Sequence, residues 1–306
     1  MKHPIDPKVD CVFKALLGTQ ENANLLISFI NAIIGDTLES PITSVDIIDP
    51  HNAKETRDDK LSIVDVKAKD NHNNIYQIEV QVEVFPSTAA RMLYTWSDVY
   101  SKQLQSGIDY DQLKSTYSIW LLYNSISDNE HYVDQYHMQN KNGRLITPHG
   151  GIWAIELNKF TTIGISNETE RWLTFFQQAE TLYDQDLPNW MQTTEMRQAM
   201  STLKRFSDKE REYHQYQARQ NYLREQSCIK RELEERAKRL DDQTKLTEEQ
   251  SKRADEEAKK AADALQREES ALQREKSAVQ EKEAALAKLK ALEALLANQN
   301  TPEDDK

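Results

Sequence analysis

The stretch LSIVDVKAKDNHNNIYQIEVQVEV, residues 61–84, decides the fold of this chain. Apolar and polar residues alternate over residues 62–69 and again over 75–84, which is the period of a half-buried β-strand. Residues 70–74 between them read Asp-Asn-His-Asn-Asn, a composition typical of a tight turn. The stretch therefore predicts a β-hairpin.

The alternation also predicts which side chains share a face of this hairpin. Asp65 and Lys67 fall on one face of the first strand, and Glu79 and Gln81 share a face of the second. Pairing the strands brings these four polar side chains together. Contact with water explains many polar faces of hairpins, but Asp65 shares its face with the apolar Ile63, so we expect it to be half-buried.

Two carboxylates on neighbouring strands are the outline of a site for a hard cation. Mg²⁺ prefers oxygen ligands, keeps several waters, and usually needs one or two carboxylates in addition to a substrate phosphate. Asp65 and Glu79 therefore predict a site for Mg²⁺ or Mn²⁺.

The wider sequence resembles a known family of nucleases. An Asp followed fourteen residues later by Glu-x-Gln is similar to the D…ExK signature of the PD-(D/E)XK nucleases. That signature alone is weakly specific. The ordered segments FKALLG, LISFINAII, VDVKAKD, IYQIEVQ and RMLYTWSDVYSKQL are more specific, and they resemble the recombination-promoting nuclease (Rpn), or putative transposase, branch of that superfamily. The resemblance runs from about Asp6 to about Phe176.

This resemblance implies a fold and an activity. The implied fold is α/β, a restriction-endonuclease-like core with a mixed sheet flanked by helices. The implied activity is metal-dependent endonucleolytic hydrolysis of phosphodiester bonds in DNA. Asp65 and Glu79 would ligate the metal, and the carbonyl of Val80 would add a ligand.

One position departs from the superfamily's pattern. A Lys usually follows the Glu-x step, where it orients the attacking water and offsets negative charge. This chain has Gln81, as the Rpn branch often does, and Gln can hold a water by hydrogen bonds but brings no charge. Lys67 is predicted on the same face as Asp65, where it would supply that charge; the alternative is a lysine that faces solvent.

Two further pairs are accessory candidates. Asp10 and Lys14 lie one helical turn apart, either as a surface ion pair or with Asp10 as an extra acid near the metal, as in some related nucleases. Arg91 and Tyr94 lie on a predicted helix over residues 87–104. Arg91 is suited to bind phosphate in bidentate fashion, or it pairs with a surface carboxylate. Both alternatives stay open.

The composition limits which binding partners and which cellular compartment we expect. The net charge of −12 does not favour sequence-independent affinity for DNA, although a bound metal would offset part of it. Two distant cysteines give no disulfide framework, and no signal sequence or membrane span is visible. We therefore expect a cytoplasmic protein that is not attached to a membrane. No GxxxxGK[ST] motif is present, so no nucleotide cofactor is expected.

The pattern of apolar residues predicts the remaining elements and the domains. Helices are expected over residues 6–17, 21–34, 87–104 and 168–183, strands over 42–49, 117–123, 131–138 and 151–157, and an unbroken helix from Met191 to Asn298. The expected domains are a nuclease-like domain (1–185), a helical connector (186–225), a long charged helix or weak coiled coil (226–298) and a disordered C-terminus (299–306). Glu156, in the last strand, is either a neighbour of the site or a structural acid.

The back third repeats every seven residues. One heptad position holds Leu265, Leu272, Val279 and Leu286, and its companion position holds Glu268, Glu275, Lys282 and Leu289. Three of these four companions are charged, whereas a stable dimer needs both positions apolar. The pattern of the tail therefore predicts either a weak homo-oligomer or one long helix with ion pairs between successive turns. An alternative function follows: an inactive nuclease fold that serves as a scaffold, which Gln81 and the acidic charge favour and the Asp65–Glu79 pair opposes.

Overall fold

The structure is a computed structural model that describes residues 2–50, 64–182 and 187–299, with the side chains of the last helix described as far as Glu293. Its contacts divide the chain into two compact units. The first unit ends at Ile229 and contains the sheet; the second begins at Lys230 and consists of the distal part of a single helix.

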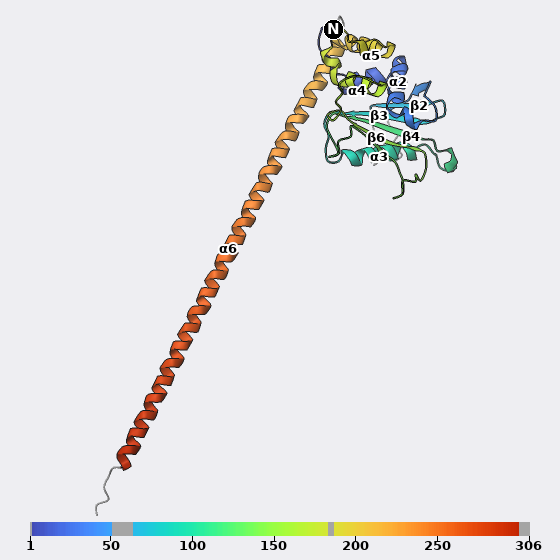
Figure 1. Ribbon diagram of the computed structural model, residues 1–306. Coiled ribbons are helices and arrows are strands. Elements are labelled where there is room, and N and C mark those ends of the chain that lie inside the picture. The colour runs from blue at the N-terminus through green and yellow to red at the C-terminus, as the bar shows by residue number, and fades with distance from the viewer. Residues whose placement is uncertain (1, 51–63, 183–186, 300–306) are drawn as a thin grey trace, which may run out of the picture. The chain divides into compact units, whose positions relative to one another are not determined.

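The first unit is built on a six-stranded mixed sheet (Figure 1). The strand order is β1-β2-β3-β4-β6-β5, with bounds β1 Val45–Ile47, β2 Val66–Asp70, β3 Ile75–Gln81, β4 Thr116–Leu122, β5 Val133–Tyr136 and β6 Gly150–Glu156. The two central pairs, β3–β4 and β4–β6, are parallel, and the other three pairs are antiparallel. The carboxyl ends of β3, β4 and β6 therefore lie at one edge of the sheet.

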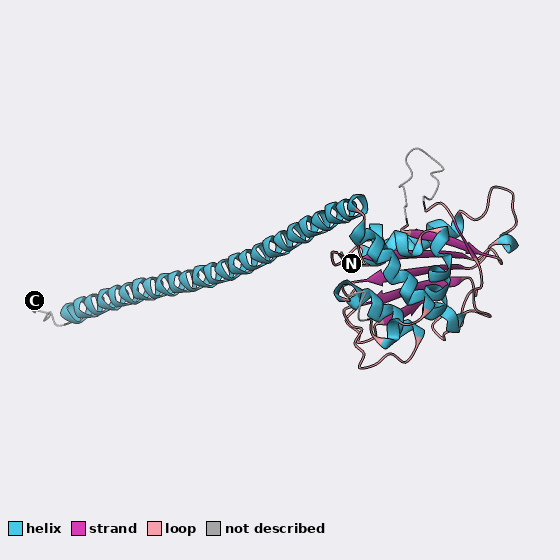
Figure 2. Cartoon of the chain, turned by 90° about the horizontal axis from the view of Figure 1, so that it is seen from above, coloured by secondary structure: helices cyan, strands magenta, loops and turns pink. Residues whose placement is uncertain are grey.

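Helices cover both faces of this sheet. The helices of the first unit are α1 Asp10–Leu17, α2 Ala23–Ile34, α3 Thr88–Ser101, α4 Glu168–Gln178, α5 Thr194–Asp208 and the first turns of α6 Glu210–Gln299. Buried residues of α1, α2, α4 and α5 form one core cluster with one face of the sheet, whereas Met92 of α3 packs on the other face with Trp120 and Leu122. Figures 1 and 2 show these layers.

The central strand β4 shows why the sequence folds this way. Ile119 and Leu121 contribute to the core beneath α1, α2, α4 and α5, while Trp120 and Leu122 contribute to the core beneath α3. A strand buried on both faces favours a nearly continuous apolar run, which β4 has from Ile119 to Leu122. The predicted buried strand and the predicted restriction-endonuclease-like α/β fold are both confirmed.

The predicted hairpin is present as β2 and β3. Asp70 organises its turn, since its Oδ1 accepts hydrogen bonds from the backbone N–H groups of His72 and Asn74, at 2.8 and 2.9 Å. Asn73 adopts the left-handed conformation, with φ of 68°, which asparagine tolerates. Residues 51–63, including Ile63, lie outside the described residues, and β3 ends at Gln81 rather than at the expected Val84.

The helical region after the sheet differs from the prediction of one unbroken helix. Met191 lies in a 3₁₀ turn, α5 starts only at Thr194, and the chain leaves the helical conformation at Lys209, with ψ of 116°, before α6 begins. No Gly or Pro marks this break. Tertiary packing explains it, because the turn lets both Phe206 of α5 and Tyr216 of α6 become buried in the same core.

The first unit thus extends past residue 185, where we expected the nuclease-like domain to end. The N-terminus also binds the helical segment: the Asp6 N–H donates to the Tyr216 hydroxyl at 3.0 Å, and the His3 N–H donates to Ser207 Oγ at 2.7 Å. Helix α5 and the first turns of α6 are therefore part of the first unit.

The second unit is the distal part of α6. Its described side chains, from Lys230 to Glu293, are almost all exposed. Across the described residues, none of the helices has the length and apolarity needed to span a membrane.

Candidate active site

A cavity of 340 Å³ lies at the carboxyl end of β3. Its walls come from α1, from the residues just before β2, from the end of β3, from α3 and from the first turns of α6. The charged and polar side chains that line it include Asp10, Lys14, Asp65, Glu79, Gln81, Arg91 and Arg219. Six of the predicted site residues are thus brought to one cavity: Asp10, Asp65, Glu79, Val80, Gln81 and Arg91.

The two predicted metal ligands lie opposite each other. In the antiparallel register Val66 pairs with Ile78, so Asp65 lies one step further along, opposite Glu79. Both side chains are largely withdrawn from water, with 13% of the Asp65 side chain and 1% of the Glu79 side chain exposed. The structure thus brings the two carboxylates together, as the alternation of the hairpin indicated, while their role as metal ligands stays a prediction.

Asp65 is held by one backbone group and one cation. Its Oδ2 accepts a hydrogen bond from the Val80 N–H at 3.0 Å, and its Oδ1 lies 3.3 Å from Nζ of Lys14. Burial raises the pKa of Asp65, and these two contacts oppose that shift without cancelling it. The lysine comes from α1, a long way from Asp65 in the sequence.

Glu79 is less well satisfied. Its Oε2 lies 3.5 Å from both Arg91 Nη2 and Gln81 Nε2, which are long contacts. Its Oε1 is buried and has no hydrogen-bond partner among the described residues. Burial, and then the charge of Asp65, raise the pKa of Glu79 to about 8, although Arg91 and Lys14 oppose the shift. The positive charge near this carboxylate therefore does not offset its burial and the charge of Asp65.

These residues fit a divalent cation. Two neighbouring carboxylates, one with an unpartnered oxygen, supply hard oxygen ligands in a cavity large enough for water and phosphate. In the part of the chain that the structure describes, no group of three or more His, Cys, Asp or Glu side chains is placed to hold a metal. The remaining ligands would come from water, substrate or a backbone carbonyl, as Mg²⁺ accepts.

The accessory candidates are placed more precisely than the sequence allowed. Asp10 lines the cavity, where its Oδ1 accepts a hydrogen bond from Arg219 Nε at 2.8 Å, while Lys14 reaches Asp65. Arg91 contacts the buried Glu79 and donates to Gln81 Oε1 at 3.2 Å. These contacts match neither of the two surface ion pairs considered as alternatives, Asp10 with Lys14 and Arg91 with a surface carboxylate.

Two candidates lie outside the cavity lining. Tyr94 is 47% exposed on α3. Lys67 pairs in register with Gln77, two residues along the strand from the carboxylate pair. Burial lowers the pKa of Lys67, and the charges of Asp98 and Asp49 oppose that shift, which places its ammonium near these acids. Among the described lysines, Lys14 is the one with an ion pair to this pair of carboxylates, its Nζ lying 3.3 Å from Asp65 Oδ1.

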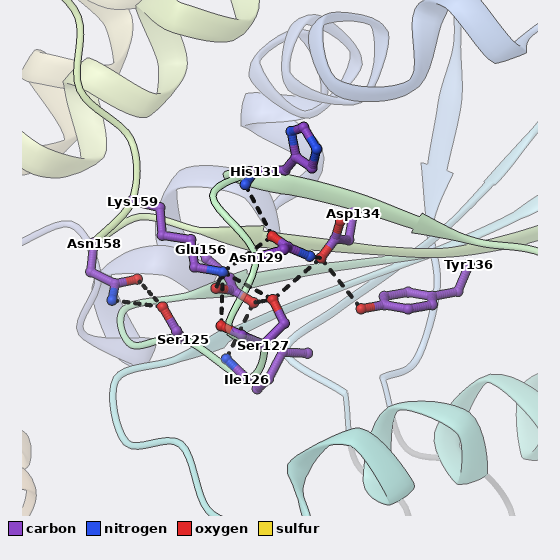
Figure 3. A network of polar contacts seen from close by, with 10 residues as sticks. All are labelled: Ser125, Ile126, Ser127, Asn129, His131, Asp134, Tyr136, Glu156, Asn158 and Lys159. Carbon is purple, nitrogen blue, oxygen red and sulfur yellow. Dashed lines mark hydrogen bonds and ion pairs between the residues drawn. The ribbon is translucent and has the colours of Figure 1, made fainter.

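Glu156 lies at the same edge of the sheet but serves a different purpose (Figure 3). Its Oε1 accepts hydrogen bonds from the Ile126 N–H and the Ser127 hydroxyl, at 3.2 and 3.0 Å, and its Oε2 lies 2.5 Å from Lys159 Nζ. Lys159 also donates to the Ser127 carbonyl at 2.9 Å. Glu156 is a structural acid that fixes the loop after β4.

Comparison with known proteins adds a family to this geometry. A family model described as PD-(D/E)XK nuclease family transposase matches residues 7–232. The chain belongs to this family. No curated protein and no solved structure gave a match.

The family match bears on the type of activity and on the extent of the folded unit. A PD-(D/E)XK nuclease family transposase is of the nuclease type, a hydrolase that acts on phosphodiester bonds, and such nucleases generally use divalent metals. The match continues through α5 and the first turns of α6, close to the end of the first unit at Ile229. It therefore includes the part of α6 that brings Arg219 to the cavity.

Proposed function

We propose that this chain is a metal-dependent DNA endonuclease that hydrolyses phosphodiester bonds with Mg²⁺ or Mn²⁺. The observation that supports the proposal most is the buried pair of Asp65 and Glu79. One Glu79 oxygen has no partner among the described residues, and the cavity around the pair is also lined by lysine and arginine side chains. Buried like charges of this kind are costly unless a cation joins them.

Asp65, Glu79 and the carbonyl of Val80 would hold the ion. A divalent ion bound there would neutralise charge on the scissile phosphate and lower the pKa of a bound water. Gln81, whose amide is next to Glu79, would orient that water by hydrogen bonds. The missing lysine charge would come from Lys14, in place of Lys67 from β2.

Arg91 would bind the substrate phosphate. Its side chain is half exposed and makes only long contacts with Glu79, so donors of its planar guanidinium stay available for a bidentate contact. Tyr94, one turn later on α3, would contact DNA outside the cavity. Asp10 would act as an accessory acid whose charge Arg219 balances.

The proposed compartment is the cytoplasm. Cys11 and Cys228 lie far apart in the sequence and give no disulfide framework, which is typical of proteins in a reducing compartment.

Nicking of supercoiled plasmid tests the proposal. The protein should convert supercoiled to open-circular DNA with Mg²⁺ or Mn²⁺ and leave it intact with EDTA; Ca²⁺ tests whether binding without cleavage occurs. Absence of cleavage with every divalent ion, together with absence of metal binding, would replace the proposal by the scaffold function. The exposed α6 helix and Gln81 favour that alternative, in which the helix assembles copies of an inactive fold.

A further inference from the structure

The distal part of α6 carries an exposed row of apolar side chains. Leu265, Leu272, Val279 and Leu286 follow one another at intervals of seven residues, and between 50 and 61% of each is exposed. Seven residues are nearly two helical turns, so these side chains share one side of the helix. Such a row on an otherwise charged helix is typical of a helix–helix interface.

The companion core position decides what the row can pair with. Three residues after each member of the row come Glu268, Glu275, Lys282 and Leu289. In a parallel, in-register pair of identical helices, each core residue faces its own copy. Glu268, Glu275 and Lys282 would then form three successive layers of like charge, an arrangement that opposes association.

Reversing one helix removes this conflict. In an antiparallel pair the two core positions face each other, so Leu265 faces Leu289 of the second copy and Glu268 faces Leu286. Leu272 then faces Lys282 of the second copy, which lies between Glu268 and Glu275 of the first, about 5 Å along the axis from each. Opposite charges thus become neighbours, and the twofold symmetry provides this contact twice.

The helix itself does not satisfy these charges. Elsewhere on α6 the pairs Arg239–Glu235 and Lys245–Asp241 form ion pairs at 3.4 and 2.6 Å. Over residues 265–289, all of which the structure describes, no ion pair joins two side chains. The charged companions are therefore available to a partner.

We propose that residues 265–289 form an antiparallel pair with the same segment of a second copy of this chain, in the register that sets Leu272 opposite Lys282. Only five apolar residues per copy take part, so association is weak and depends on protein concentration.

Disulfide trapping in the full-length chain tests the orientation. Cys228 is exposed and is first replaced by Ser, whereas Cys11 is half-buried and burial raises its pKa to about 11, which keeps it unreactive. Mild oxidation of the Leu265→Cys, Leu289→Cys double variant should give a dimer in which residue 265 is linked to residue 289 of the other copy. Leu272→Cys is the matched control and should not link to itself. A 272–272 link would overturn the proposal.

Charge reversal provides a second test by sedimentation equilibrium. Lys282→Glu should raise the dimer dissociation constant at least about tenfold, and the triple variant Glu268→Lys, Glu275→Lys, Lys282→Glu should restore it. A parallel pair would respond to neither change, because each variant keeps like charges opposite each other. A chain that stays monomeric at every concentration would also overturn the proposal, in favour of a single extended helix.

Discussion

Glu79 and Glu156 lie near the carboxyl ends of two parallel strands, on opposite sides of β4, and each is 1% exposed. Glu156 is surrounded by donors and a lysine, whereas Glu79 has one oxygen without a partner and a second carboxylate opposite it. Their pKa values shift in opposite directions. The comparison teaches that burial alone does not identify a functional acid; what distinguishes Glu79 is missing charge, which a ligand can supply.

The largest expected effect is on cleavage. Asp65→Ala and Glu79→Ala should each reduce plasmid nicking to the level seen with EDTA, because each removes a ligand of the ion that activates the water. Glu156→Ala is the matched control, and its folded fraction should nick DNA at the wild-type rate. Equal loss in all three variants would mean that the two glutamates do not differ in function.

The two lysines give the next largest effect. Lys14→Ala should lower the nicking rate by about 10²–10³-fold, the scale of removing one preorganised electrostatic contact, since Lys14 approaches Asp65. Lys67→Ala should leave the rate unchanged, because Lys67 is placed near Asp98 and Asp49. The reverse result would restore Lys67 as the source of charge.

Gln81 offers a way to rescue the loss of Lys14. Gln81→Lys should maintain or raise wild-type activity and should partly restore cleavage in Lys14→Ala, since it adds a cation next to Glu79. Gln81→Glu should impair cleavage, because it adds negative charge where the phosphate binds. Plasmid nicking under matched conditions measures the effect of all three changes. If Gln81→Lys does not restore any cleavage to the Lys14→Ala variant, then a charge at position 81 does not replace the charge of Lys14.

The two glutamates should exchange their importance when folding stability is measured in place of cleavage: changing Glu156 should have the larger effect. Glu156→Ala leaves Lys159 buried without its carboxylate, and it should lower the free energy of unfolding by about 3–5 kcal/mol. Glu79→Gln removes one of two repelling carboxylates and should leave the free energy of unfolding unchanged or raise it. Urea unfolding followed by circular dichroism measures both; a strongly destabilised Glu79→Gln variant would contradict the view of Glu79 as a strained functional acid.

The smallest effect is on the pH dependence of stability in EDTA. The pKa of Glu79 is raised from its ordinary 4.5 to about 8, so its contribution to stability is fully present below pH 4.5 and is lost as the pH rises towards 8. Burial acts to raise the pKa of Glu156, but hydrogen bonds from Lys159, Ser125, Ser127 and Ile126 outweigh it and hold the pKa below its ordinary value. The contribution of Glu156 is therefore present above pH 4.5 and is lost as the pH falls through its lowered pKa.

Unfolding curves between pH 5 and 8 should separate these two terms. The wild-type protein should lose stability as the pH rises over this range, and Glu79→Gln should flatten that decline. Parallel curves for the two proteins would show that Glu79 titrates normally.

The sequence predicted local geometry well and long-range contacts poorly. The period of two in the hairpin placed Asp65 opposite Glu79, because neighbouring strands fix both register and face. The same period also put Lys67 on the predicted face, but it could not show that the charge of Asp98, from α3, acts on this lysine.

Contacts between distant elements carried no local signal. Lys14 reads as one member of a surface pair with Asp10 until α1 is packed against the sheet. Arg219 comes from a helix that resembles a solvent-exposed tail. The break at Lys209 contains no Gly or Pro that would signal it in the sequence. It is produced by the packing of Phe206 and Tyr216 in one core. A fragment that ends at residue 205 would lose both aromatic residues, so one that ends at residue 232 is the better folding unit.

The central claim is that Asp65 and Glu79 together hold one divalent ion, and calorimetric titration with Mn²⁺ tests it most directly. The wild-type protein should bind one ion and release protons at pH 7, because the raised pKa of Glu79 keeps it protonated in the free protein. Glu79→Gln should abolish this binding, while Glu156→Gln should retain it. Binding of Mn²⁺ to Glu79→Gln with wild-type affinity and stoichiometry would contradict the account.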